Sequence, residues 1–118
     1  MTRLAQPDAS DLIASAAAGD EYAFRRIIAA HHDDMRRVCV YVARDRAIAD
    51  EATQAAWVIA WNKIGSVREP ARLRPWLMAV AANEAKQLLR KRRRRAEIEV
   101  GTGGSREPGG MDPSEEVG

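Results

Sequence analysis

The segment RPWLMAVAANEAKQLLRKRRRR, residues 74–95, begins with apolar residues at helical spacing and ends in six consecutive basic residues. Those basic residues, 90–95, span more than about one and a half turns of a helix, because one turn takes about 3.6 residues. Their charges therefore point in every direction around the helix axis and cannot all lie on one protein face. At least some of them meet solvent or a polyanion.

Charge is divided unevenly along the chain. The 118 residues carry a formal net charge of +2. Residues 96–118 hold six acidic side chains against Arg106 alone, a net charge of −5, so residues 1–95 carry +7. A basic body of this kind favours a nucleic-acid partner.

Composition limits the class of protein. With 46% hydrophobic but only 5% aromatic residues, the chain has room for one domain with a small, mainly aliphatic core. Cys39 is the single cysteine, so no intramolecular disulfide can form, and a reducing cytoplasm is the expected compartment. The longest wholly apolar runs are far below the ~18 residues that begin to indicate a membrane span, so no membrane partner is expected.

The hydrophobic pattern predicts four helices, at residues 10–19, from Asp20 to near Arg44 or Asp45, at 47–65 and from Leu73 onward. Ser10 and Asp20 are expected to cap the first two, and Gly19 and Gly65 to end the first and third. The buried stripes are predicted to be Phe24, Ile27, Ile28, His31, Met35, Val38, Cys39 and Val42; Ile48, Ala52, Ala56 and Ile59; and Leu73, Leu77, Val80, Ala81, Ala85 and Leu88.

These segments predict an all-α fold, a compact bundle of three to four helices with a disordered C-terminal tail. Residues 1–9 are expected to be a flexible N-terminus, 10–96 the helical domain and 97–118 an acidic Gly/Pro-rich linker or tail. Six of the eight glycines lie beyond Val100, where too little apolar surface is available to offset the entropy of ordering.

The basic run has two interpretations. Lys and Arg side chains at phosphates release condensed counterions, which gives salt-sensitive nucleic-acid binding without base information. The alternative is a solvated helix end whose cations interact favourably with the helix dipole. The +7 charge of residues 1–95 favours the first.

A second feature is DEATQAAWVIAW, residues 50–61, in which two tryptophans continue a polar helical face: Asp50, Gln54, Trp57 and Trp61. Tryptophan is enriched in binding hot spots, so this face suits a protein partner. The alternative is that both indoles belong to the core while the polar residues, Asp50, Glu51 and Gln54, stay exposed.

Signals for chemistry are sparse. The motif HHDD, residues 31–34, places His31 three residues before Asp34, half of a metal site that no second cluster completes. The sequence has no Gly-rich phosphate loop, no nucleophile elbow and no Cys/His set with metal-ligand spacing. We therefore expect a non-enzymatic protein without a metal or other cofactor.

Several segments together resemble the second domain, region 2, of bacterial extracytoplasmic-function (ECF) sigma factors. They are AFRRIIAAHHDDMRRVCVYVARD at 23–45, ADEATQAAWVIAW at 49–61, LRPWL at 73–77 and AAN at 81–83, and the resemblance covers about residues 10–95. It implies a transcription initiation module that binds core RNA polymerase and recognises and melts the minus-ten promoter element.

The resemblance also implies roles for particular residues. The third helix would dock on the clamp helices of the largest polymerase subunit through Asp50, Glu51, Gln54, Trp57 and Trp61. Three arginines and an asparagine would approach unstacked bases of the minus-ten non-template strand: Arg68, Arg72, Arg74 and Asn83. Its phosphates would be held by Lys86, Arg90, Lys91, Arg92, Arg93, Arg94 and Arg95.

Two other interpretations stay open. One is a helical adaptor that binds a protein partner and touches nucleic acid only nonspecifically; the other is a bait domain that binds an anti-sigma protein and needs no DNA contact. A preference for single-stranded promoter sequence distinguishes a sigma-factor domain from an adaptor. Nothing after residue 100 resembles the domain that reads the minus-thirty-five element, so we expect either one domain of a longer factor or a short protein without full promoter recognition.

Overall fold

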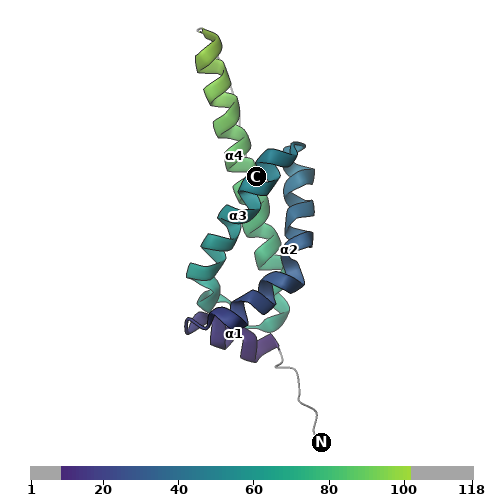
Figure 1. Ribbon diagram of the computed structural model, residues 1–118, viewed down its shortest axis with the longest axis vertical. Coiled ribbons are helices and arrows are strands. Elements are labelled where there is room, and N and C mark those ends of the chain that lie inside the picture. The colour runs from purple at the N-terminus through teal and green to yellow at the C-terminus, as the bar shows by residue number, and fades with distance from the viewer. Residues whose placement is uncertain (1–8, 102–118) are drawn as a thin grey trace, which may run out of the picture. The chain divides into compact units, whose positions relative to one another are not determined.

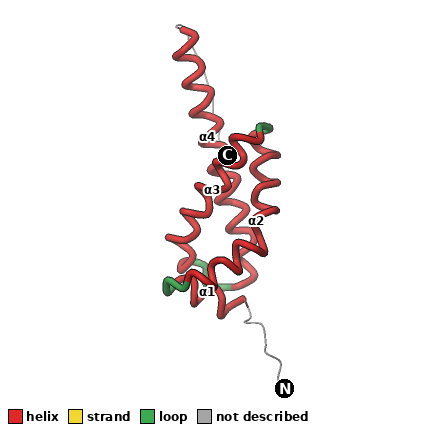
Figure 2. Tube along the Cα trace, viewed as in Figure 1, coloured by secondary structure: helices red, strands yellow, loops and turns green. Residues whose placement is uncertain are grey.

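The computed structural model describes residues 9–101, which form four α-helices and two short 3-10 helices (Figure 1). In order they are α1 (Ala9–Ala17), α2 (Glu21–Ala43), α3 (Arg46–Lys63), η1 (Ile64–Ser66), η2 (Pro70–Arg72) and α4 (Leu73–Gly101). Loops in this stretch are confined to short connections (Figure 2), which confirms the predicted all-α fold. The chain divides into two compact units, one up to Gln87 and one from Leu88.

The turn between α1 and α2 follows from Gly19. Its φ of 100° is readily adopted only by glycine. The Gly19 N–H donates to the carbonyl of Ala16 at 3.0 Å, and the Asp20 N–H donates to the carbonyl of Ser15 at 2.9 Å. These two bonds form a Schellman motif, so the predicted stop at Gly19 is confirmed.

Aspartates start the next two helices. Asp20 Oδ1 accepts from the N–H groups of Tyr22 and Ala23 at 3.0 and 3.3 Å, as its predicted capping role requires. Asp45 Oδ1 accepts from the Ile48 N–H at 3.0 Å and caps α3 in the same way. Each cap satisfies donors that have no partner inside the helix.

Three boundaries differ slightly from the prediction. Ser10 lies inside α1, which begins at Ala9, and Gly65 lies in η1 because α3 ends at Lys63 and tightens into a 3-10 turn. Helix α4 continues to Gly101, beyond the expected domain end at 96. The expected flexible N-terminus up to residue 8, and the expected tail from residue 102, lie outside the described residues.

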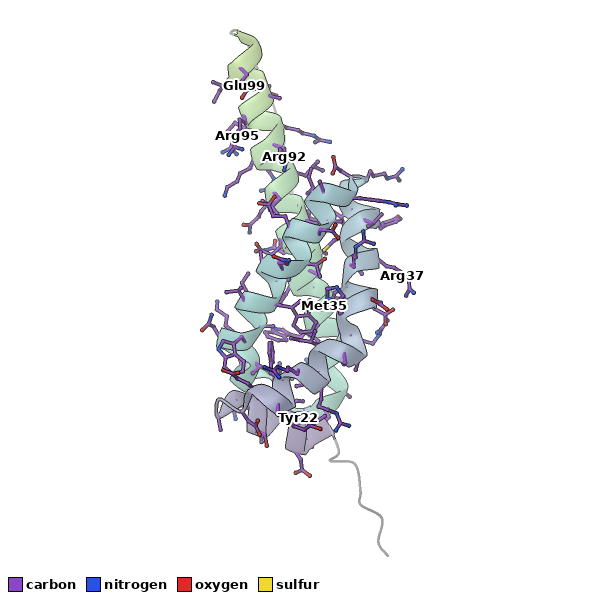
Figure 3. All side chains as sticks on the ribbon, viewed as in Figure 1. Tyr22, Met35, Arg37, Arg92, Arg95 and Glu99 are labelled. Atoms are coloured by element: carbon purple, nitrogen blue, oxygen red, sulfur yellow. The ribbon has the colours of Figure 1, made fainter. Side chains whose placement is uncertain are left out.

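The core of the first unit lies among α2, α3 and the part of α4 up to Gln87. Met35 of α2 is fully buried there, whereas Arg37 two residues later extends into solvent (Figure 3). The Cys39 thiol donates to the carbonyl of Ala81 in α4 at 3.4 Å, and burial raises the pKa of that thiol. Every residue of the three predicted stripes is buried or half-buried, which confirms them.

Small side chains let the helices approach closely. Four alanines spaced along α3 are fully buried: Ala49, Ala52, Ala56 and Ala60. Thr53, also buried, donates its hydroxyl to the carbonyl of Ala49 at 2.7 Å, so no polar group is left unsatisfied on this side chain. Helix α1 lies across the end of the bundle and contacts α2, α3 and η1 (Figure 1).

The described part of the second unit is the continuation of α4. All side chains of residues 90–99 are exposed, and Arg92, Arg95 and Glu99 extend from the ribbon (Figure 3). Between Ala9 and Gly101, no helix combines the length and apolarity needed to cross a membrane.

Candidate functional site

The polar face predicted on α3 is exposed and partly tied to α2. Asp50, Glu51 and Gln54 are all exposed. Arg36 Nε of α2 donates to Asp50 Oδ1 at 2.6 Å. This hydrogen bond and the negative charge of Asp50 raise the pKa of Arg36. Asp50 therefore presents its carboxylate in an orientation that α2 helps to fix.

The two tryptophans of α3 differ in burial. Trp57 is 8% exposed, whereas Trp61 is half-buried. The ring of Phe24 from α2 makes edge contacts with both, at centroid distances of 5.6 Å to Trp57 and 4.9 Å to Trp61. For Trp57 the burial favours the core interpretation, while Trp61 keeps surface available for a partner.

Trp57 has a polar partner that sequence reasoning missed. Its Nε1–H donates to Nδ1 of His32 at 3.1 Å. An imidazole nitrogen that accepts carries no proton, so this bond requires the tautomer with its proton on Nε2. His32 belongs to the HHDD motif, which drew attention only as half of a metal site. The described residues contain no group of three His, Cys, Asp or Glu side chains that could hold a metal ion.

An apolar groove of about 390 Å³ lies between α2 and α3. Val58 is 62% exposed at this groove, beside the half-buried Trp61. The groove is lined by Glu21, Phe24, Arg25, Ile28, Trp57, Val58 and Trp61. An exposed valine next to an aromatic ring is a surface that a protein partner can cover.

A larger hollow, of about 730 Å³, lies where the connection between α3 and α4 meets the first turn of α4. Its apolar part includes the side chains of Val67, Pro75 and Trp76, and its charged part includes Arg68 and Arg72. The complete lining is Ser66, Val67, Arg68, Glu69, Ala71, Arg72, Pro75 and Trp76. Two predicted DNA contacts, Arg68 and Arg72, are therefore brought to one site.

The third arginine of this group, Arg74, is held elsewhere. Its Nη1 donates to Asp34 Oδ2 at 2.5 Å, and Arg37 donates to the other oxygen of Asp34 at 2.6 Å. The hydrogen bond from Arg74, followed by its charge, holds the pKa of Asp34 below its ordinary value. Arg74 thus anchors the start of α4 to α2.

His31 lies beside this ion pair. Burial, and then the charge of Arg74, lower the pKa of His31, while Asp34 opposes the shift. Its Nδ1 is buried and has no hydrogen-bond partner among the described residues. A neutral imidazole therefore suits this position better than a charged one.

The remaining predicted DNA contacts are all exposed on α4. Asn83 and Lys86 belong to the first unit, and the basic run belongs to the second. The run consists of Arg90, Lys91, Arg92, Arg93, Arg94 and Arg95. These cations face solvent, where phosphates can reach them.

Comparison with known proteins agrees with this arrangement. Residues 27–95 match the family model Sigma-70 region 2. The chain is 32% identical over 80 residues, 68% of its length and 20% of the relative's, to the probable RNA polymerase sigma factor RfaY of Xanthomonas campestris. It is 33% identical over 82 residues, 70% of its length and 42% of the relative's, to the ECF RNA polymerase sigma factor SigM of Mycobacterium tuberculosis.

A further relative is the RNA polymerase sigma factor CarQ of Myxococcus xanthus, 29% identical over 100 residues, 81% of this chain and 58% of CarQ. The chain therefore spans from a fifth to under three fifths of the length of these relatives. No solved structure matches the chain significantly. The matched residues include α3, the hollow at the connection between α3 and α4, and the basic run. The chain belongs to the Sigma-70 region 2 family, with ECF sigma factors among its relatives.

Proposed function

We propose that this chain is a non-enzymatic transcription initiation module of a sigma factor that acts in the cytoplasm. It binds core RNA polymerase through α3 and captures single-stranded bases of the minus-ten element with the connection between α3 and α4. The observation that carries the proposal is the hollow of about 730 Å³ that joins Trp76 to Arg68 and Arg72.

The size and lining of the hollow suit an unstacked base. Pockets for small ligands measure about 300–1,000 Å³ and combine apolar walls with a few polar groups. Trp76, Val67 and Pro75 supply the apolar part. Stacking of a base on an aromatic ring contributes about 1–3 kcal/mol and is available only after the duplex opens. Such a site stabilises melted DNA over double-stranded DNA.

Exposed cations supply further contacts for the nucleic acid. Arg68 and Arg72 stand at the hollow itself, and Asn83 is exposed on α4 with an amide that can hydrogen-bond a base or the backbone. Lys86 and the basic run supply charge for the phosphates of the non-template strand. Phosphate contacts position the strand, and the hollow supplies the contact with a base.

The polymerase contact is assigned to the exposed polar residues of α3, with Trp61 at their end. Asp50, Glu51 and Gln54 offer carboxylates and an amide, and Trp61 offers a half-buried indole. A polar rim beside an aromatic anchor is the usual composition of a protein interface. The partner surface is the clamp helices of the largest polymerase subunit.

The test is the double variant Glu51→Ala with Gln54→Ala. We expect at least a tenfold loss of affinity for core RNA polymerase, since interface hot spots cost about 2 kcal/mol or more. The free energy of unfolding should change by about 0.5 kcal/mol or less, because both positions are exposed. Affinity is measured by fluorescence anisotropy of labelled chain.

The matched control is Glu97→Ala with Gln87→Ala, which removes the same two residue types from exposed positions on α4 that do not line the groove between α2 and α3. This control should bind polymerase like the wild type. Polymerase binding by the Glu51/Gln54 variant at the wild-type level would remove the assignment of α3 as the docking helix.

A second candidate function is a helical adaptor or bait domain that binds a protein such as an anti-sigma factor. The apolar groove of about 390 Å³ with exposed Val58 favours it. The two functions differ in strand preference, because an adaptor has no reason to bind single-stranded minus-ten sequence more tightly than a scrambled sequence. Equal binding of the two oligonucleotides, together with no binding to polymerase, would favour the adaptor.

A further inference from the structure

Helix α2 carries an exposed tyrosine that belongs to none of the surfaces described above. Tyr41 is 76% exposed, although an aromatic side chain normally packs in a core or an interface. Within residues 9–101 its ring contacts no other aromatic ring, no guanidinium group lies over it, and its hydroxyl forms no hydrogen bond. The fold therefore gives no reason for an aromatic residue at this position.

The other exposed tyrosine of α2 is placed differently. Tyr22 is 64% exposed, and the guanidinium group of Arg26 lies over its ring, 6.0 Å from the centroid. The same arginine donates a hydrogen bond to the Tyr22 hydroxyl at 3.5 Å. The ring of Tyr22 therefore has a partner within the chain, whereas the ring of Tyr41 stays available to a partner from outside.

Arg44 follows α2 in a backbone conformation that arginine rarely adopts. Its φ of 57° and ψ of 32° are left-handed, and between Ala9 and Gly101 no other non-glycine residue has a positive φ. Its N–H donates to the Val40 carbonyl at 2.7 Å, a bond that glycine would form without crowding a Cβ against the backbone. A cation favours the negative end of a helix dipole, but one within the last helical turn gains this without a left-handed backbone. The turn itself therefore does not explain the arginine.

A second cation comes two residues later, at the first position of α3. Arg46 is exposed, and a cation at the start of a helix meets the positive end of its dipole. In the described part of the chain neither Arg44 nor Arg46 forms an ion pair. Asp45 between them serves the fold, because its Oδ1 accepts the Ile48 N–H at 3.0 Å. The turn thus presents two guanidinium groups that the fold does not use.

We propose that Tyr41, Arg44 and Arg46 form a second contact for single-stranded DNA. A base stacks on the ring of Tyr41, and phosphates of the same strand lie at the two arginines. Sites for single strands combine cations along the backbone with aromatic rings on which bases stack. The inference rests on the proposed function for the source of the strand, since opening of a promoter supplies it.

The combination of a ring and two arginines selects among polyanions. An acidic peptide would pair with the guanidinium groups but offers no base to stack on Tyr41. Duplex DNA offers phosphates but keeps its bases stacked on one another. A single strand supplies both phosphates and free bases, and every base can stack because each has a π-face. The contact is therefore expected to be insensitive to base sequence.

The turn lies at the opposite end of α3 from the hollow. This helix of 18 residues is about 27 Å long at about 1.5 Å per residue. Phosphates of one strand in a duplex are about 3.4 Å apart along the axis, so this length corresponds to about eight nucleotides, or fewer in an extended strand. Substitutions at the turn therefore leave the hollow intact, and the two contacts can be tested separately.

The test is photocrosslinking of the chain to an oligo-dU of about 12 nucleotides that carries 5-iodouracil in place of uracil. Irradiation joins this base to an aromatic ring stacked on it, and mass spectrometry of tryptic peptides locates the bond. Tyr41 lies in the peptide 38–44, and Trp76, at the hollow, in the peptide 73–86. We expect crosslinks in both. The peptide with Tyr22 should give a yield lower by about fivefold or more, because stacking on that ring competes with Arg26.

Arg44→Gly separates binding from folding. Below saturation, the yield on Tyr41 should fall about three- to tenfold, the range for one exposed charge-assisted hydrogen bond. The yield on Trp76 should not change. The melting temperature should equal or exceed that of the wild type, since glycine adopts the left-handed backbone readily. Arg25→Gln is the matched control: it removes a cation that is 76% exposed on the same helix and should leave the Tyr41 yield unchanged.

The outcomes separate the inference from the proposed function. No crosslink on Tyr41, or equal yields on Tyr41 and Tyr22, overturns the inference, while a crosslink on Trp76 leaves the proposed base capture standing. Crosslinks on none of these rings overturn both. Poly-glutamate of equal charge that suppresses the Tyr41 crosslink as well as unlabelled oligo-dU would assign the turn to an acidic peptide and likewise overturn the inference.

Discussion

Helix α3 and the basic run at residues 90–95 differ in what holds their side chains. In α3 the exposed polar residues share the helix with Ala52, Ala56 and the nearly buried Trp57. In the basic run every side chain is exposed. A substitution at a buried residue of α3 therefore acts through packing, whereas one in the run acts through charge. A loss of binding identifies a residue that contacts the partner only where the fold does not depend on that residue.

The largest expected effect is a loss of stability on substitution of Trp57, a buried residue of α3. Trp57→Ala should lower the free energy of unfolding by about 3–5 kcal/mol, the usual cost of removing a large aromatic side chain from a core. Trp57 is 8% exposed, touches the ring of Phe24 and donates to His32, so its loss leaves a cavity and an unpaired imidazole nitrogen. Denaturant unfolding followed by circular dichroism measures the change.

The neighbouring Val58 supplies the control, because it is 62% exposed on the same helix. Val58→Ala should change the free energy of unfolding by about 0.5 kcal/mol or less. If Trp57→Ala changed the free energy of unfolding as little as Val58→Ala, the indole of Trp57 would be a surface group and not part of the core.

The basic run should show a binding effect without a stability effect. Replacing four arginines, Arg92 to Arg95, with serine should flatten the salt dependence of single-strand binding, because each phosphate contact contributes about 0.7 to the logarithmic slope. Loss of all four contacts would lower the slope by about 3. Anisotropy titrations across a salt series give the slope, and thermal unfolding should match that of the wild type.

Replacement of the same four residues with lysine is the control for charge alone. Lysine keeps the positive charge and should keep the slope. A slope that serine substitution leaves unchanged would show that the run is a solvated helix end, the alternative that the sequence leaves open.

Local sequence chemistry predicts most of the fold. The capping aspartate Asp20 and the stop at Gly19 act within five residues of their partners, so the sequence alone is enough to place the turn. Periodicity likewise predicts the buried stripes, because it depends on spacing within one helix. Ser10 and Gly65 are exceptions. Ser10 lies inside α1, and Gly65 lies in a 3-10 turn that packs against α1.

The candidate site is less predictable because its contacts join distant residues. The bond between Trp57 and His32 spans 25 positions, and the one between Arg74 and Asp34 spans 40. No spacing rule links such pairs. Sequence reasoning therefore could not choose between core and surface for Trp57, and it grouped Arg74 with Arg68 and Arg72 although α2 holds Arg74 through Asp34.

Arg74 joins α4 to α2 through its ion pair with Asp34, and removal of this pair gives the smallest expected effect. The pKa of Asp34 is lowered in the folded chain, so the unfolded chain takes up this proton at higher pH. The stabilisation is therefore fully present above the ordinary value of 3.8 and is lost as pH falls below it. The pKa of His31 is also lowered, so its contribution has the same sign and begins to be lost below 6.5.

Asp34→Asn should flatten the fall in melting temperature below about pH 4, by a few degrees at most, because Asp34 and Arg74 are partly exposed and exposed ion pairs contribute little. Asp33→Asn is the control, since this adjacent carboxylate is exposed and is not the partner of Arg74. The acid limb of Asp33→Asn should follow the wild type. If both variants flattened the fall in melting temperature equally, the total charge of the chain rather than the ion pair between Asp34 and Arg74 would explain the acid sensitivity.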